Sequence, residues 1–185
     1  MTATLKRRLL TVDEYHKMAE AGILKPDDKV ELINGEIITT SPINSKHAGY
    51  VKRIIALFTK LVNDDTIISV RDPIRLNKHS EPEPDIAILK FRSDYYTETH
   101  PTPKDVILLI EVSDSSVNVD RSFKLPLYAK SGIQEFWIVN LKSNQIEVYK
   151  KPKGDAYEIE ETYKKEKSIK LEQLDALIDV AKIFF

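Results

Sequence analysis

The chain has 185 residues, a length that suits one domain, and 42% of them are apolar, which is enough for a hydrophobic core. It contains no cysteine, which excludes disulfides, zinc–thiolate sites and thiol catalysis and leaves carboxylates, carbonyls and histidines as metal ligands. With 29 acidic and 28 basic residues, its formal charge of −1 does not favour a tight, nonspecific nucleic-acid binder.

The N-terminal segment carries basic residues with no apolar stretch behind them, so we expect no secretory signal. No apolar run approaches the roughly 20 residues that a membrane span requires, so we expect a cytoplasmic protein without a membrane partner. The first predicted element is a helix. Thr11 and Glu14, three residues later, form the pattern of a capping box, and Gly22 is a plausible end.

A β-hairpin and a long helix come next. Residues 29–33 and 36–40 flank Asn34-Gly35, the dipeptide most typical of a two-residue hairpin turn. Apolar residues at helical spacing then predict a helix from about Ser45 to Val62. Three short strands are expected after it, at residues 66–70, 73–76 and 84–89, followed by a polar loop at 91–103.

The second half of the chain has buried strands around one helix. Residues 106–112 (VILLIEV) are almost wholly apolar, which is typical of a central strand covered on both faces. A helix is expected from about Val119 to Ser131, and residues 134–139 (QEFWIV) form another buried strand. Further segments are expected to extend the sheet as antiparallel edge strands, at 146–150, 157–160 and 168–171.

This order of elements predicts an α/β protein with a mixed β-sheet flanked by helices. We expect one domain that spans residues 1–185. Its core lies at about 9–150, and its C-terminal strands lie at about 151–185.

Two acids are the most informative residues for chemistry. Asp85 begins a strand directly after Pro84, and Glu111 interrupts an apolar strand near its C-terminal end. A charge in a buried strand is costly unless it is paired or binds a cation. Asp85 and Glu111, with the carbonyl of Val112 as a third oxygen, would suit a hard divalent ion such as Mg²⁺ or Mn²⁺. Such an ion polarises a phosphoryl oxygen and lowers the pKa of a bound water.

Lys124 lies on the following predicted helix, on the same face as Leu127 and Tyr128, so we expect it to point toward the sheet. There it could stabilise charge on phosphorus. Structural explanations remain open beside this one. Asp85 could be a turn residue at the start of a strand. Glu111 could form a salt bridge with Lys124 or Arg121 that carries no chemistry.

Pro84-Asp85 followed by Ile110-Glu111-Val112-Ser113 resembles the signature of the PD-(D/E)XK nuclease superfamily. More closely, the chain is similar to a large bacterial family of proposed restriction endonucleases of uncertain biological role. The order and spacing of the matching segments are together more specific than any one segment. The segments lie within about 9–150 and are 30–36, Ser41-Pro42, His47, 83–85, 110–113, Asp120, Lys124, Tyr128 and 132–139. The resemblance implies the restriction-endonuclease-like fold and metal-dependent cleavage of DNA.

One position departs from the superfamily pattern. The lysine expected two residues after Glu111 is Ser113 here, and the resemblance implies that Lys124 on the next helix takes its place. It also implies that Glu31 in the hairpin and His47 line the site. The alternatives for Glu31 are a solvated hairpin residue or a cap on a neighbouring helix, and the alternative for His47 is a core histidine with a satisfied hydrogen bond.

The leading hypothesis is therefore a Mg²⁺- or Mn²⁺-dependent DNA endonuclease that uses Asp85, Glu111 and Lys124. A non-catalytic DNA- or protein-binding module on the same fold is the main alternative. An acid–base enzyme that uses His47 and Glu31 without a metal is a third. We also expect a homodimer, because nucleases of this fold often pair to reach both DNA strands and because sheet edges need cover.

Overall fold

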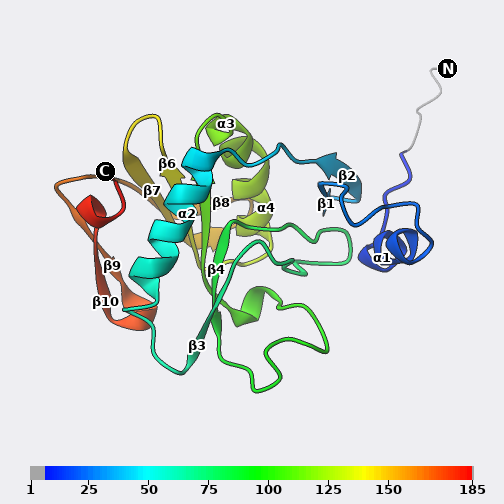
Figure 1. Ribbon diagram of the computed structural model, residues 1–185, viewed down its shortest axis with the longest axis horizontal. Helices are drawn as coiled ribbons and strands as arrows, with labels where there is room; N and C mark the ends of the chain where they lie inside the picture. Colours follow the sequence, from blue (N-terminus) through cyan, green and yellow to red (C-terminus); the bar gives the residue numbers. More distant parts are fainter. Residues whose placement is uncertain (1–6, 185) are drawn as a thin grey trace.

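A six-stranded sheet with helices on both faces forms the centre of the computed structural model, which describes residues 7–184 (Figure 1). Its strands, in spatial order, are β3 (Thr66–Ser69), β4 (Ile86–Lys90), β5 (Val106–Ser113), β6 (Glu135–Asn140), β7 (Gln145–Lys153) and β8 (Ala156–Lys164). The pair β5 and β6 is parallel, and all other neighbours are antiparallel. The predicted mixed sheet is therefore confirmed.

Two helical layers cover this sheet. Helix α2 (Ser45–Phe58) packs on one face, where Phe58 contacts the ring of Trp137 edge-on. The segment that crosses from β5 to β6 covers the other face, where Tyr128 contacts Phe136 edge-on. This segment consists of α3 (Val117–Val119), η2 (Asp120–Lys124) and α4 (Leu125–Lys130).

Alternation along β5 decides which way Glu111 points. Leu108, Ile110 and Val112 pack on the α2 side, and Leu109 packs on the α4 side. Successive side chains in a strand point to opposite faces, so Glu111 shares the face of Leu109. The acid therefore points toward the helix that follows β5.

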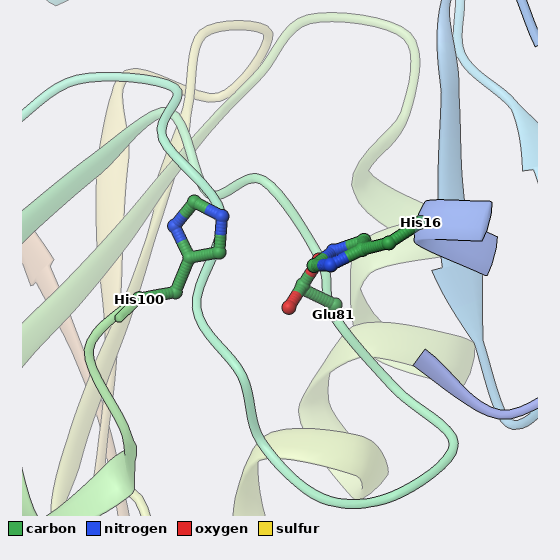
Figure 2. A group of neighbouring side chains, drawn as sticks. All are labelled: His16, Glu81 and His100. Atoms are coloured by element: carbon green, nitrogen blue, oxygen red, sulfur yellow. The ribbon is translucent and has the colours of Figure 1, made fainter. Parts of the chain in front are cut away.

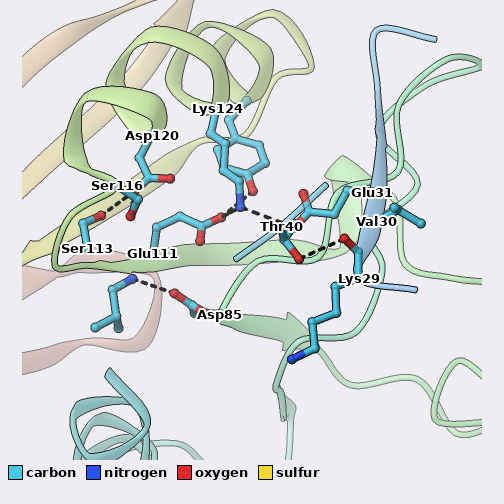
Figure 3. Close-up of polar contacts among 12 residues, drawn as sticks. Lys29, Val30, Glu31, Thr40, Asp85, Glu111, Ser113, Ser116, Asp120 and Lys124 are labelled. Carbon is cyan, nitrogen blue, oxygen red and sulfur yellow. Dashed lines mark hydrogen bonds and ion pairs between the residues drawn. The ribbon is translucent and has the colours of Figure 1, made fainter. Parts of the chain in front are cut away.

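The crossover segment contains one wide turn. Within η2, a π-helical turn, the Leu125 N–H donates to the carbonyl of Asp120, five residues back. Pro126 comes next and has no N–H to donate, so a regular α-helical ladder would be interrupted here in any case. The wide turn places Asp120 and Lys124 on the side that faces the end of β5 (Figure 3).

Helix α1 (Val12–Glu20) and the hairpin of β1 (Val30–Ile33) and β2 (Glu36–Thr39) lie beside the main sheet (Figure 1). The capping box between Thr11 and Glu14 is present as predicted. The turn is also as predicted, because Asn34 and Gly35 have φ angles of 51° and 78°. The backbone of Gly35 bonds to both neighbours of the hairpin: its N–H donates to His79 and its carbonyl accepts from Leu10.

One predicted strand is absent, and another is present but pairs in a different sheet. Residues 73–76 form no ladder, because the Ile74 N–H donates to Pro82 and the Arg75 N–H donates to Pro101, in two separate segments. The strand at 168–171, β9 (Ser168–Leu171), does not extend the main sheet. It pairs instead with β10 (Ala176–Asp179), which was not predicted, and its apolar residues pack on the α2 side of the core.

The predicted helix boundaries also shift. Helix α2 ends at Phe58 rather than at Val62, and the crossover helix begins at Val117 rather than at Val119. The 91–103 segment is a loop as predicted. Short 3₁₀ turns complete the chain: η1 (Pro103–Asp105), η3 (Glu172–Leu174) and η4 (Val180–Lys182). Among the described residues, no helix has the length and apolar character to cross a membrane.

Candidate active site

A cleft of about 470 Å³ opens between the hairpin, the start of α2, the meeting ends of β4 and β5, and the crossover segment. Every residue that the sequence analysis assigned to a site lines it: Glu31, His47, Asp85, Glu111, Val112 and Lys124. The structure therefore brings together three charged groups from a strand start, a strand end and a helix (Figure 3).

Asp85 lies directly before β4, whose first residue pairs with Ile110 of β5. This register brings its carboxylate to the end of β5, where Oδ2 accepts the Val112 N–H at 2.9 Å. His47 Nε2 lies 2.9 Å from the same oxygen. A carboxylate can only accept, so the ring nitrogen donates. Asp85 is thus held by two donors and is more than a turn residue at a strand start.

His47 reaches this position through the start of α2. The side chain of Asn44 caps the helix by accepting the His47 N–H at 2.8 Å. The side chain of His47 is only 15% exposed and points into the cleft region beside Asp85. The alternative of an acid–base pair between His47 and Glu31 finds no support, because the histidine pairs with Asp85.

Glu111 is almost fully buried, with 4% of its surface exposed, and two donors contact one of its oxygens. Lys124 Nζ donates to Oε1 at 2.9 Å, and the Tyr128 hydroxyl donates to the same atom at 2.8 Å. The predicted orientation of Lys124 toward the sheet is therefore correct. The alternative partner, Arg121, is engaged elsewhere, since it forms two hydrogen bonds with Glu147.

Burial and the neighbouring charges act in opposite directions on the pKa values of Glu111 and Lys124. Burial raises the pKa of Glu111 to about 8, although the charge of Lys124 acts in the opposite direction. For Lys124, burial alone would lower the pKa, but the charges of Glu111 and Glu31 outweigh it and raise the pKa. Lys124 therefore stays protonated.

Glu31 of β1 approaches from the opposite wall and is 4% exposed, so the alternative of a solvated hairpin residue is wrong. Its Oε1 lies 3.7 Å from Lys124 Nζ, and its buried Oε2 has no hydrogen-bond partner among the described residues. Burial raises the pKa of Glu31, with the charge of Lys124 opposing the rise.

The departure at Ser113 has a structural reason. Its hydroxyl donates to Asp120 Oδ2, which also accepts from Ser116 at 3.0 Å, so the position serves the start of the crossover segment. A lysine there would displace these bonds. The amine instead comes from Lys124, one turn after Asp120, and reaches Glu111 from the helix side (Figure 3).

Sequence reasoning missed several residues of this site. The sequence placed Tyr128 on the sheet-facing side of its helix, which is correct for the ring but leaves out the hydroxyl that donates to Glu111. Glu83 lines the cleft, and burial raises its pKa. Its place two residues before Asp85 was a usable signal, because alternate residues in an extended segment face the same side. Arg71 and Phe123 also line the cleft, and no pattern in the sequence marks them.

Asp85 and Glu111 each use only one carboxylate oxygen for hydrogen bonds within the described part of the chain. Among the described residues, the donors to Asp85 all end on Oδ2 and those to Glu111 all end on Oε1. Each acid therefore keeps one oxygen without a protein partner, and Glu31 keeps a third. Hard divalent cations take oxygen ligands of this kind, so the residues present fit such an ion.

The fold and this site define a class. The chain is a restriction-endonuclease-like α/β protein that carries an acid, acid and lysine set in one cleft. The family model described as "Uma2: Putative restriction endonuclease" matches residues 12–179, so the chain belongs to this family. The resemblance found in the sequence is thereby confirmed, and it supports a nuclease role.

A solved structure from Anabaena variabilis ATCC 29413, described as a putative nuclease belonging to DUF820, has the same fold. It superposes with a TM-score of 0.72 at 16% sequence identity, and the match covers 95% of this chain and 97% of that chain. At this identity the likeness concerns the fold. A comparison with curated proteins gives no match.

Proposed function

We propose that the cleft is the active site of an endonuclease that hydrolyses phosphodiester bonds in DNA with the help of Mg²⁺ or Mn²⁺. One observation carries the proposal: Asp85, Glu111 and Lys124 line a single cleft, and each acid keeps a free oxygen. Family membership supports the same proposal, because the matching family model is described as "Putative restriction endonuclease".

Asp85 and Glu111 would hold the ion, with the Val112 carbonyl as a further oxygen ligand. Once bound, a divalent ion supplies a Lewis acid and an activated water for attack on phosphorus. The protein's own residues do the positioning. His47 and the Val112 N–H fix Asp85, and Tyr128 fixes Glu111, so neither acid has to reorganise when substrate arrives.

Lys124 would act on the substrate itself. Its protonated amine lies at the same end of the cleft as both acids and can donate to a non-bridging phosphate oxygen, where negative charge grows during the reaction. Glu31 and Asp120 surround the amine with negative charge and so keep it protonated.

The test is cleavage of supercoiled plasmid and of single-stranded DNA with Mg²⁺, Mn²⁺ or EDTA. We expect cleavage with either ion and none with EDTA. Asp85→Asn and Glu111→Gln should abolish it, and Lys124→Ala should lower the rate by about 10²–10³-fold. Lys130→Ala is the matched control, because Lys130 is exposed at the end of the same helix. Wild-type rates in all three cleft variants would exclude this site.

The alternative is a binding module that uses the same cleft to bind DNA or protein without cleaving it. The acids in the cleft outnumber its bases, and the whole chain is near neutral, which is unusual for a nucleic-acid enzyme without its ion. Calorimetry with Mn²⁺ separates the two ideas. Mn²⁺ binding that depends on Asp85, together with no cleavage of either DNA substrate, would favour the module.

The homodimer is also a proposal. The argument from sheet edges is weakened, because the edge strand β8 carries Glu158, Glu160 and Glu161, and charged side chains already protect such an edge. The argument from the substrate is unaffected, since two copies are needed to cut both strands of a duplex with one cleft each. Light scattering that gives about one chain mass would contradict it.

A further inference from the structure

Away from the cleft, two histidines and a glutamate from three separate segments meet (Figure 2). His16 lies on α1, Glu81 lies between β3 and β4, and His100 lies in the 91–103 loop. One ligand atom of each lies within 4.8 Å of the ligand atoms of the other two. In the part of the chain that the structure describes, this is the one group of three histidine or carboxylate ligands at such spacing.

Glu81 is the unusual member of this group, because its side chain is only 2% exposed. Its backbone N–H donates to the Leu32 carbonyl at 2.8 Å, which fixes the residue against β1. Its Oε1 lies 2.5 Å from His16 Nε2, but its buried Oε2 has no partner among the described residues. Burying a carboxylate oxygen without a donor is costly, so one histidine does not satisfy this acid.

His100 supplies the further observation. Its ring centre lies 6.1 Å from that of His16, with the two planes at 72°. The Arg75 N–H donates to Pro101, the next residue, and so holds this part of the loop in place. A simple ion pair between His16 and Glu81 does not require a second imidazole beside it. If both rings were protonated they would repel each other.

We propose that His16, Glu81 and His100 form a second metal site, which takes Zn²⁺ or a similar transition-metal ion. Two imidazoles and one carboxylate suit zinc, with a fourth position open, and they do not suit Mg²⁺. With metal–ligand bonds of about 2.1 Å, tetrahedral ligands lie about 3.4 Å apart. His16 Nε2 and Glu81 Oε1 now lie 2.5 Å apart, and all three ligand atoms lie within 4.8 Å of one another, so movements of about 1 Å complete the site.

An ion here would add a further link between three segments that are already joined by backbone hydrogen bonds and by the ion pair between Arg75 and Asp13. One of the backbone bonds runs from the Val12 N–H to Lys78, and another runs from the Arg75 N–H to Pro101. None of the three ligands lines the cleft. Glu81 lies two residues before Glu83, which does line it, so the ion would brace the segment that leads to Asp85.

The test is titration of the whole chain with Zn²⁺ in excess Mg²⁺, which occupies oxygen-ligand sites and competes poorly for imidazole. Calorimetry gives the stoichiometry and the dissociation constant, and the visible absorption of Co²⁺ reports nitrogen ligands. His100→Ala is the informative variant, because the His100 side chain has no hydrogen bond to lose among the residues that the structure describes. His79→Ala is the matched control: its Nδ1 contacts the Leu10 carbonyl, outside the group.

We expect wild type and His79→Ala to bind one Zn²⁺ per chain and to melt at a higher temperature with Zn²⁺. In the absence of metal, His100→Ala should have the same melting temperature as wild type, and Zn²⁺ should not raise it. The variant should bind Zn²⁺ at least about 100-fold more weakly, because losing a metal ligand lowers the affinity more than losing a residue that only contacts a ligand. Equal Zn²⁺ affinity in His100→Ala and wild type would overturn the proposal, as would the absence of Zn²⁺ binding by wild type. Neither result depends on whether the cleft cleaves DNA.

Discussion

Replacing Tyr128 by phenylalanine removes one hydroxyl from a fully buried ring and leaves the packing of that ring intact. In the wild type this hydroxyl donates to Glu111 Oε1 at 2.8 Å. Burial raises the pKa of Glu111 to about 8, so the measurement is made at about pH 9, where this acceptor is charged. A hydrogen bond to a charged group contributes about 1.5–3 kcal/mol to stability, so we expect Tyr128→Phe to lower the free energy of unfolding by about 2 kcal/mol. In a chain of 185 residues, this corresponds to a fall in Tm of about 4–8 °C.

Tyr157 provides the matched control. Its hydroxyl is also buried, but it has no hydrogen-bond partner among the described residues. Tyr157→Phe therefore removes the same atom without breaking a protein hydrogen bond, and the free energy of unfolding should stay within about 1 kcal/mol of wild type or rise. The two substitutions change composition identically, so their difference measures the contact with Glu111.

The assay is urea unfolding of both variants in EDTA, with thermal melts as a second measure. Tyr128→Phe should shift the urea midpoint downward without changing the slope, because the surface exposed on unfolding is unchanged. Equal shifts in the two variants would refute the reasoning, since they would show that the hydroxyl on Glu111 contributes no more than an unpartnered one.

Burial raises the pKa of Glu135, so the folded state holds this proton to a higher pH than the unfolded state does. The stability that this group contributes is complete below pH 4.5 and is lost as the pH rises through the raised pKa. Glu135→Gln should therefore reduce the loss of stability with rising pH. Unfolding is followed by the fluorescence of Trp137, the single tryptophan. Gly35→Ala should cost about 2 kcal/mol or more in urea unfolding, because φ is +78° and the added carbon would lie 2.6 Å from Leu9 Cβ. Gly154→Ala, at φ +65° with open space around it, should cost less, and equal losses would contradict this account. Phe123 lines the cleft and is 61% exposed, so Phe123→Ala should leave Tm unchanged. If bases stack on this ring, the substitution should weaken binding of single-stranded DNA by about 1–3 kcal/mol, as measured by fluorescence anisotropy. Unchanged affinity would exclude base stacking at Phe123.

Local patterns were sufficient for much of the fold. Asn34-Gly35 predicted a turn that depends on the two turn residues alone, and Thr11 with Glu14 predicted a cap that is equally local. The strand at 168–171 was placed in the wrong sheet because its partner, β10, follows it in the chain and has a weak apolar pattern. Pairing is a choice among several candidate segments of the chain, which one segment's sequence does not decide.

Some residues of the site could also be predicted from local patterns, and others could not. Glu111 was found because an acid within an apolar strand is costly, and that cost is visible in the sequence. Tyr128 and Arg71 were missed because what matters about them is where a side chain ends after the helix and the loop have packed. The group around Glu81 was missed for the same reason, since its three members lie far apart in the chain.

The wide turn at residues 120–124 has a consequence for how this cleft can vary among relatives. In a regular α-helix, side chains four positions apart are rotated by about 40°, so three of them drift off a common line. The extra residue in the π turn offsets that drift between Asp120 and Lys124. A relative without the extra residue would have a regular α-helical turn here, and the segments before and after the turn would keep their register. Such a relative could thus lose one residue from the crossover and still keep its charge-stabilising amine on the side that faces β5.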